Sequence, residues 1–225
     1  MAPDLKISII EKRFPGAVTP VFADFELALE PSSVTALLGP SGVGKSTLLR
    51  LIAGIDQKFT GSIAIGDRPA AAAPPPGMLF QDARLLPWLT ALDNVRLARP
   101  DLPVETARTA LENVGLAAHA NAWPHALSGG MQRRVALARA LCTNAGLLLL
   151  DEPFVSLDRA LVADMRQLLA GHIAQTGATV LFTTHQPEDA ASLASRIITL
   201  NGHPAKVVSD TAARPPAYPA PPPAV

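Results

Sequence analysis

The stretch GPSGVGKST at residues 39–47 decides how the rest of the chain is interpreted. It fits the pattern G-x-x-x-x-G-K-[ST], with the apolar run VTALL (34–38) before it and the helically spaced STLLRLIAG (46–54) after it. Glycines allow successive backbone N–H groups to curl around phosphate oxygens, and the following helix adds the positive end of its dipole. The segment therefore predicts a strand, a phosphate-binding loop and a helix.

Each polar side chain of this loop is expected to make a different contact with a bound nucleotide. Lys45 is expected to act on the β- and γ-phosphates as a point charge, Ser46 to offer its hydroxyl to Mg²⁺, and Thr47 to donate to a phosphate. The alternative is a glycine-rich turn that caps a helix beside a solvated lysine, but the flanking strand and helix favour nucleotide binding. The predicted nucleotide-binding residues of the loop are Gly39, Pro40, Ser41, Gly42, Val43, Gly44, Lys45, Ser46 and Thr47.

Two carboxylates follow the apolar run LLLL at residues 147–150. In open α/β sheets, ligands bind beyond the carboxyl ends of the strands. Asp151 is therefore expected to hold Mg²⁺, directly or through water, and Glu152 to polarise the attacking water as a general base. A strand that ends in a solvated acidic turn is the alternative, which the phosphate loop upstream disfavours.

Gln81 and His185 also follow short apolar runs directly, GMLF at 77–80 and LFTT at 181–184. Taken singly, such a glutamine is usually polar surface, and such a histidine is usually structural. If the strands are parallel neighbours, however, both side chains reach the same sheet edge as the phosphate loop and the acidic pair. The sequence then predicts a single site at that edge.

Strand and helix patterns alternate towards both ends of the chain, whereas the middle, from Leu89 to Ala145, is helical with no apparent strand. This favours an α/β core with a helical insertion. Residues 66–77 indicate a Pro/Ala surface loop, and the dipeptide Asn201–Gly202 indicates a hairpin. The tail from Thr211 is mostly proline and alanine and is expected to be disordered. Further strands are expected at 5–10, 21–30, 62–65, 178–184 and 196–200, with helices at 131–142, at 158–170 and after Pro187.

The composition narrows the class of protein. The chain has 225 residues, 48% of them apolar, and its 19 Lys and Arg balance its 19 Asp and Glu. This neutrality disfavours a dedicated nucleic-acid binder. The single cysteine, Cys142, rules out an internal disulfide and fits a reducing compartment. Because no apolar run approaches the roughly 18 residues of a membrane span, the chain is expected to be soluble and cytosolic, and to meet a membrane only through a partner.

Taken together, these motifs resemble those of the nucleotide-binding subunit of the ATP-binding-cassette (ABC) transporters. The discriminating motif is LSGGMQ (127–132), because P-loop enzymes in general do not carry it. The motifs appear in the order typical of that family. GPSGVGKST is similar to its Walker A loop, Gln81 to the Q-loop, LSGGMQ to the signature, LLLLDEP (147–153) to Walker B, SLD (156–158) to the D-loop and His185 to the H-loop.

The resemblance implies a fold of the α/β class: a P-loop NTPase cassette with a RecA-like core, an antiparallel β subdomain and a helical signature subdomain. A single ABC ATPase domain would cover residues 1–210. Within it, the core and the β subdomain would take 1–88 and 146–210, and the helical subdomain would take 89–145. Residues 211–225 would form the disordered tail.

The resemblance also implies that two copies of the cassette close on two ATP molecules, most simply as a homodimer. Ser128, Gly129 and Gly130 would bind the γ-phosphate of ATP held by the second copy, since a capped helix with bare N–H groups suits an anion. Gln132 would belong to the same nucleotide-binding segment, and Asp158 would communicate between the two sites.

For hydrolysis, the resemblance implies that Glu152 activates water, His185 contacts the γ-phosphate, and Gln81 links the metal site to a transmembrane subunit. Phe14 stands where the family usually places an aromatic residue that stacks on adenine, with ordinary core packing as the alternative. The predicted catalytic residues are Glu152, His185, Gln81 and Lys45, and the predicted metal ligands are Ser46, Gln81 and Asp151, with ATP and Mg²⁺ as cofactors.

The segment FQDARLLPWLTALDNV (80–95) resembles the importer subfamily for sulfonates, taurine and nitrate, whose close relatives carry thiamine precursors. Its Leu85, Leu86, Trp88 and Leu89 would offer apolar surface to a coupling helix, with packing inside the helical block as the alternative. The implied partners are a second copy, a separate transmembrane permease and, indirectly, a substrate-binding protein, with no nucleic acid. The implied location is the inner face of the cell membrane.

Two other functions compete with the importer. One is a soluble cassette ATPase that acts on ribosomes or DNA; such proteins commonly carry paired cassettes, coiled coils or zinc cysteines, none of which is evident in this sequence. The other is an exporter cassette, which is commonly fused to membrane spans. Both are less favoured than the energising subunit of an importer.

Overall fold

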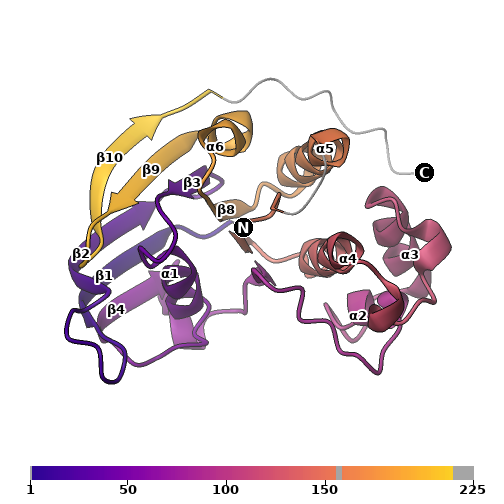
Figure 1. Cartoon of the computed structure of the whole chain (residues 1–225), viewed down its shortest axis with the longest axis horizontal. Coiled ribbons are helices and arrows are strands. Elements are labelled where there is room, and N and C mark those ends of the chain that lie inside the picture. Colours follow the sequence, from indigo (N-terminus) through magenta and orange to yellow (C-terminus); the bar gives the residue numbers. More distant parts are fainter. Residues whose placement is uncertain (1, 156–158, 215–225) are drawn as a thin grey trace.

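The computed structural model describes residues 2–155 and 159–214 and contains a sheet of six strands (Figure 1). The strands lie in the order β10-β9-β3-β8-β7-β6. Neighbouring strands are parallel except for the edge pair β9 and β10. The strands are β3 (Val34–Leu38), β6 (Gly77–Leu79), β7 (Leu147–Asp151), β8 (Thr179–Thr184), β9 (Arg196–Asn201) and β10 (Lys206–Ala212).

The central strands are apolar along their whole length because both faces of the sheet are covered. β7 and β8 are buried at every residue, which explains why LLLL shows no alternation with polar residues. Along β7, Leu147 and Leu149 belong to the core cluster shared with a smaller sheet. Leu148 and Leu150 belong to the cluster shared with the helical block. The sheet therefore has one apolar core cluster on each of its two faces.

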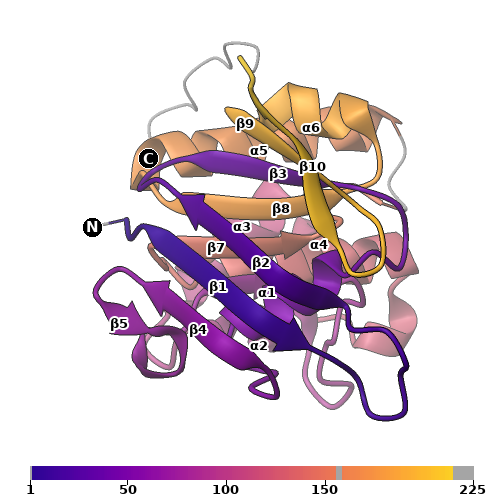
Figure 2. The same cartoon turned by 90° about the vertical axis from the view of Figure 1, so that its left-hand side faces the viewer.

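The smaller sheet has four antiparallel strands in the order β2-β1-β4-β5 and covers one side of the molecule (Figure 2). In β2 the apolar Phe25, Leu27 and Leu29 are buried, and the intervening Glu26 and Ala28 are exposed. This is the half-exposed alternation that the sequence predicts. The strands are β1 (Leu5–Lys12), β2 (Phe22–Leu29), β4 (Thr60–Ile65) and β5 (Arg68–Pro69).

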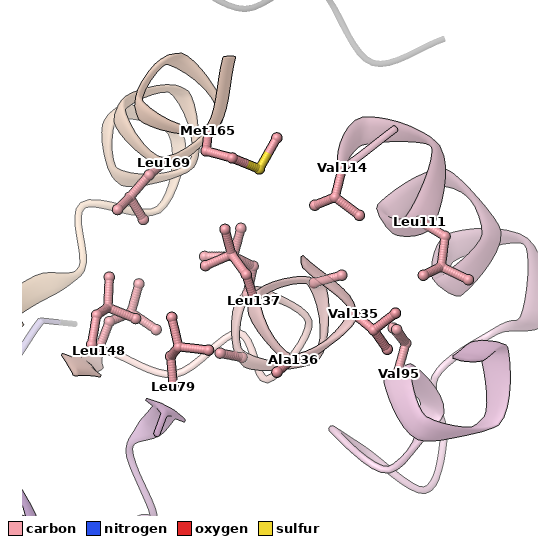
Figure 3. Close-up of a cluster of buried hydrophobic side chains, with 14 of the residues drawn as sticks. Leu79, Val95, Leu111, Val114, Val135, Ala136, Leu137, Leu148, Met165 and Leu169 are labelled. Atoms are coloured by element: carbon pink, nitrogen blue, oxygen red, sulfur yellow. The ribbon is translucent and has the colours of Figure 1, made fainter. Parts of the chain in front are cut away.

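The block between β6 and β7 contains helices and no strand within the residues that the structure describes, as predicted. α4 lies between the strands and the other helices of the block (Figure 3). Its Val135 faces Val95 of α2, and its Leu137 lies on the side of Leu79 and Leu148. The block consists of α2 (Ala91–Arg96), α3 (Val104–Asn113), α4 (Gly129–Leu141) and two short 3₁₀ segments at 117–119 and 124–126.

Three more helices complete the core: α1 (Lys45–Ile52), α5 (Arg159–Thr176) and α6 (Pro187–Leu193). α5 extends six residues beyond the predicted end at 170, with Ile173 packed against the core. α4 begins at Gly129 instead of residue 131, because Ser128 caps it. Across the described parts of the chain, no helix combines the length and apolarity that a membrane span requires.

Two predictions about irregular segments were wrong in part. The Pro/Ala loop at 66–77 contains the short strand β5 and a 3₁₀ turn at Ala70–Ala72. The first two residues of the predicted disordered tail, Thr211 and Ala212, instead pair with Ile197 and Arg196 in the β9–β10 hairpin. Pairing with the edge strand β9 gives these two residues backbone hydrogen bonds, which the neighbouring Pro- and Ala-rich sequence does not predict. The segment 215–225 lies outside the described residues.

Candidate nucleotide-binding site

The groups predicted to share one site stand at the ends of four neighbouring parallel strands. β3, β8, β7 and β6 lie side by side in that order. The phosphate loop follows β3, and His185 follows β8. Asp151 ends β7 with Glu152 directly after it, and Gln81 follows β6. The hypothesis that these strands are parallel neighbours is confirmed, so the groups meet at one edge of the sheet.

Two positions of the phosphate loop tolerate only glycine. Gly44 has a φ of 112°, and a Cβ there would lie 2.7 Å from Cγ1 of Val21. A Cβ on Gly39 would lie 2.7 Å from the carbonyl oxygen of Leu200, which belongs to the backbone of β9. The bare backbone is therefore what lets the loop fold against the sheet and remain open to a ligand.

Lys45 opens α1 beneath this loop and is 5% exposed. Its Nζ donates to the carbonyl oxygens of Gly39 at 2.7 Å and Pro40 at 3.0 Å. Burial lowers the pKa of the Lys45 amine, and the negative charges of Glu152 and Asp151 partly oppose that shift. A buried ammonium at a helix N-terminus is a site for an anion, because an anion would restore the stabilisation that water no longer provides.

A cavity of about 170 Å³ lies over the loop. With the exception of Val21, its lining consists of residues predicted for the site. The lining residues are Phe14, Val21, Ser41, Gly42, Gly44, Lys45, Ser46, Thr47, Gln81 and Glu152.

Ser46 and Asp151 come together although they are far apart in the sequence. The Ser46 hydroxyl donates to Oδ1 of Asp151 at 3.0 Å, and the same oxygen accepts from the hydroxyl of Thr183 at 2.7 Å. Asp151 is 3% exposed. Hydroxyl and carboxylate oxygens at this spacing are the hard donors that Mg²⁺ prefers. Ser46 and Asp151, two of the three predicted metal ligands, thus fit such an ion.

Glu152 adopts an unusual backbone conformation, with a φ of 51°. Its N–H donates to Oγ1 of Thr183 at 3.0 Å. Its carboxylate Oε1 lies 3.3 Å from Nδ1 of His185. Left-handed backbone in a residue with a side chain costs roughly 1–2 kcal/mol and persists only where surrounding contacts hold it. Here it carries the carboxylate to the histidine and to the cavity.

The signature segment stands apart from this cavity. Ser128 caps α4, and its Oγ accepts from the Met131 N–H at 3.3 Å. Gly129 is exposed, and a Cβ there would meet nothing within 4 Å, so its surroundings are open. The Gln132 amide donates to the carbonyl oxygens of Pro124 at 2.9 Å and Leu127 at 3.1 Å. Gln132 therefore braces the turn before the signature within its own chain.

Phe14 is 44% exposed and lines the cavity, which excludes the alternative that it packs in the core. Nζ of Lys12 lies 4.9 Å from the centroid of its ring, on one of its faces. In the segment after Gln81, Trp88 is 66% exposed, whereas Leu85 packs partly against the helical core. Asp158 lies outside the described residues.

Two residues at the site were missed by sequence reasoning. Thr183 bonds both acidic residues from the end of β8. Arg133, in α4, donates to main-chain carbonyls of the same edge, including that of Asp151 at 2.8 Å. A threonine in an apolar strand and an arginine in an apolar helix are weak indications by themselves, and only the arrangement of the strands gives them partners.

Comparison with known proteins assigns this chain to a family. The family model described as ABC transporter matches residues 22–155. The aliphatic sulfonates import ATP-binding protein SsuB 2 of Xanthomonas axonopodis pv. citri (strain 306) is 44% identical over 197 residues, which are 87% of this chain and 67% of that protein. The SsuB of Pseudomonas putida, with the same description, is 46% identical over 181 residues, which are 80% and 67% of the two chains. The chain thus spans about two thirds of the length of these relatives.

A solved structure supports the same assignment. The dimeric structure of a post-hydrolysis state of the ATP-binding cassette MJ0796, bound to ADP and Pi, superposes with a TM-score of 0.84 at 30% identity and covers 93% of this chain and 99% of that one. The fold of this chain is therefore that of an ATP-binding cassette. This chain belongs to the ABC transporter family.

Proposed function

We propose that this chain is the ATP-hydrolysing subunit of an import system, working as a dimer beneath a separate membrane permease. The observation that carries the proposal is the joint placement of the phosphate loop, Asp151, Glu152 and His185 at one sheet edge beside the cavity. The exposed signature at Gly129 supplements it, because it offers anion-binding N–H groups away from the chain's own cavity.

In this proposal ATP binds with its phosphates in the loop and its γ-phosphate near Glu152. The Glu152 carboxylate accepts a proton from water as the water oxygen attacks the γ-phosphorus, and the bond from that phosphorus to the β–γ bridging oxygen breaks. His185, within 3.3 Å of the carboxylate, holds it in place and reaches the γ-phosphate. Mg²⁺, for which Ser46, Asp151 and Gln81 provide oxygens, would neutralise phosphate charge when bound.

The dimer completes the site. The described lining of the cavity includes no residue of the signature segment, which suits the proposal that Ser128, Gly129 and Gly130 serve the nucleotide of a second copy. Bridging of the γ-phosphate by two chains would favour closure, and hydrolysis would release it. Asp158 is proposed to act at the same interface.

Phe14 is proposed to stack on adenine with the ring face that Lys12 leaves free. Phe14→Ala is expected to weaken ATP binding by about fivefold or more, because a base stacked on an aromatic ring contributes roughly 1–3 kcal/mol. Competition against a fluorescent ATP analogue measures this. Inorganic tripolyphosphate is the internal control, since it has no base; equal weakening of both ligands would contradict stacking.

The cargo is proposed from the relatives. They are named aliphatic sulfonates import ATP-binding proteins, so a small sulfonate or a similar solute is the proposed substrate. The resemblance of residues 80–95 to the importer subfamily adds a thiamine precursor as the second candidate. The exposed Trp88 and its neighbours would receive the permease, placing the chain at the inner face of the membrane. A soluble cassette acting on ribosomes or DNA is the less favoured alternative.

Purification with partners tests the transport part of the proposal. The tagged full chain is isolated from membranes of its native cell in mild detergent, and a multi-span permease is expected to co-purify. The permease, the chain and the matching substrate-binding protein, reconstituted in vesicles, should then hydrolyse ATP faster when a sulfonate is supplied. Recovery of ribosomes or nucleic acid alone, with no permease, would exclude the importer.

A further inference from the structure

Arg133 lies where the signature helix meets the catalytic edge of the sheet. It stands in the second turn of α4, four residues after Gly129, so the two positions share one face of the helix. The residue is only 8% exposed, which is rare for an arginine unless it is paired.

The guanidinium joins three main-chain carbonyls at or just beyond the ends of two strands. Nη1 donates to the carbonyl oxygen of Gln81, after β6. Nη2 donates to the carbonyl oxygens of Asp151, at 2.8 Å, and of Glu152, at the end of β7. The planar fork of arginine, with its donors in fixed directions, can hold several acceptors at once, which a lysine cannot do in the same geometry.

One of these contacts bears directly on the proposed general base. Glu152 has left-handed backbone, its N–H is held by Thr183, and its carbonyl is held by Arg133. The peptide groups on both sides of its Cα are thereby fixed, and with them the direction in which the carboxylate leaves the main chain. Arg133 thus acts on Glu152 through the backbone and not through its carboxylate.

The charge of Arg133 is also balanced at this edge. Burial lowers the pKa of its guanidinium, and the carboxylates of Asp151, Glu152 and Asp82 oppose that shift. The cation therefore lies near acidic groups of both strand ends, and its removal would take a donor from the three carbonyls and a nearby positive charge from the carboxylates.

We propose that Arg133 is a positioning residue that couples the catalytic edge of one cassette to the signature helix that serves the nucleotide of the second copy. A shift in the main chain of Gln81 or Glu152 would carry α4 with it, and with α4 the residues Ser128 and Gly129. The inference rests on the dimer of the proposed function. The proposed coupling connects the nucleotide site of one chain with its signature segment, which completes the nucleotide site of the second copy.

The test compares Arg133→Gln with Arg134→Gln in the full chain. Arg134 is the matched control, because it lies on the same helix and its Nη1 also donates to carbonyls, those of Val114 at 2.8 Å and Gly115 at 3.4 Å, but these belong to the helical block. Each variant is measured for affinity towards a fluorescent ATP analogue, for kcat of ATP hydrolysis and for thermal stability. Dimerisation at saturating ATP is measured by sedimentation in the Glu152→Gln background.

Arg133→Gln is expected to bind the analogue within about twofold of the parent, but to lower kcat by roughly 10- to 100-fold and to weaken ATP-dependent dimerisation by about tenfold or more. Arg134→Gln is expected to lose comparable thermal stability with kcat and dimerisation nearly unchanged. Arg133→Lys should recover part of kcat, because an ammonium reaches fewer of the carbonyls. Should Arg133→Gln fail to fold, Arg133→Lys carries the same comparison.

Three results would overturn the inference. Affinity for the analogue could fall as much as kcat, which would make Arg133 a residue of its own nucleotide site. The Arg133 and Arg134 variants could lose activity in proportion to their stability, which would make the role structural. The Glu152→Gln parent itself could stay monomeric in saturating ATP, which would disprove the proposed dimer and the coupling with it. Loss of dimerisation only when Arg133→Gln is added to that parent supports the coupling.

Discussion

Glu152→Gln is expected to lower kcat for ATP hydrolysis by about 10²- to 10⁴-fold, the range that a general base contributes. Glutamine keeps the size of the side chain and can still hydrogen-bond to His185. The left-handed backbone and the hydrogen bond from the residue 152 N–H to Thr183 should therefore persist. What disappears is the ability to take the proton from water. Binding of ATP should be retained, and the bound nucleotide should accumulate unhydrolysed.

Single-turnover hydrolysis of radiolabelled ATP, beside equilibrium binding of a fluorescent analogue, separates the two effects. Glu112→Gln serves as the control, because Glu112 is an exposed carboxylate of α3 away from the site. Hydrolysis by Glu152→Gln at the rate of the parent would exclude Glu152 as the general base. His185 would then be the group to replace next.

Lys45→Met is expected to weaken ATP binding by about 30-fold or more, since truncating one partner of a buried charge pair costs about 2–5 kcal/mol. Methionine fills most of the buried space of the lysine stem, so the change removes the charge rather than the packing. Its effect should appear in the dissociation constant, whereas that of Glu152→Gln should appear in kcat. Lys206→Met, at an exposed position of β10, is the control.

The pH dependence of binding follows from the same group. Burial lowers the pKa of the free Lys45 amine below its ordinary value, and phosphate oxygens beside it would raise that pKa again. Affinity for ATP should therefore be highest below the pKa of the free protein and should fall as pH rises through it towards the pKa of the complex. An affinity of Lys45→Met that falls equally at alkaline pH would show that another group is responsible.

Much of the site was predictable because its chemistry is local. The glycines, Lys45 and Ser46 act within nine consecutive residues, and a spacing of that length is visible in the sequence itself. The strands were predictable for a related reason: a strand buried on both faces must be apolar throughout, as 147–150 is. The boundaries of elements were harder to predict, because a cap such as Ser128 or an edge pairing such as that of Thr211 can extend an element by two residues.

The sequence by itself determined most of the strands and helices and where a phosphate-binding loop is predicted, since these depend on neighbours a few positions apart. The tertiary structure alone decided that β3, β8, β7 and β6 are adjacent, and therefore that the four predicted groups form one site. It alone revealed Thr183, which bonds Glu152 from 31 positions away, and Arg133, which bonds Gln81 from 52 positions away. Contacts of that range depend on the order of strands in the sheet, and no local pattern of residues records that order.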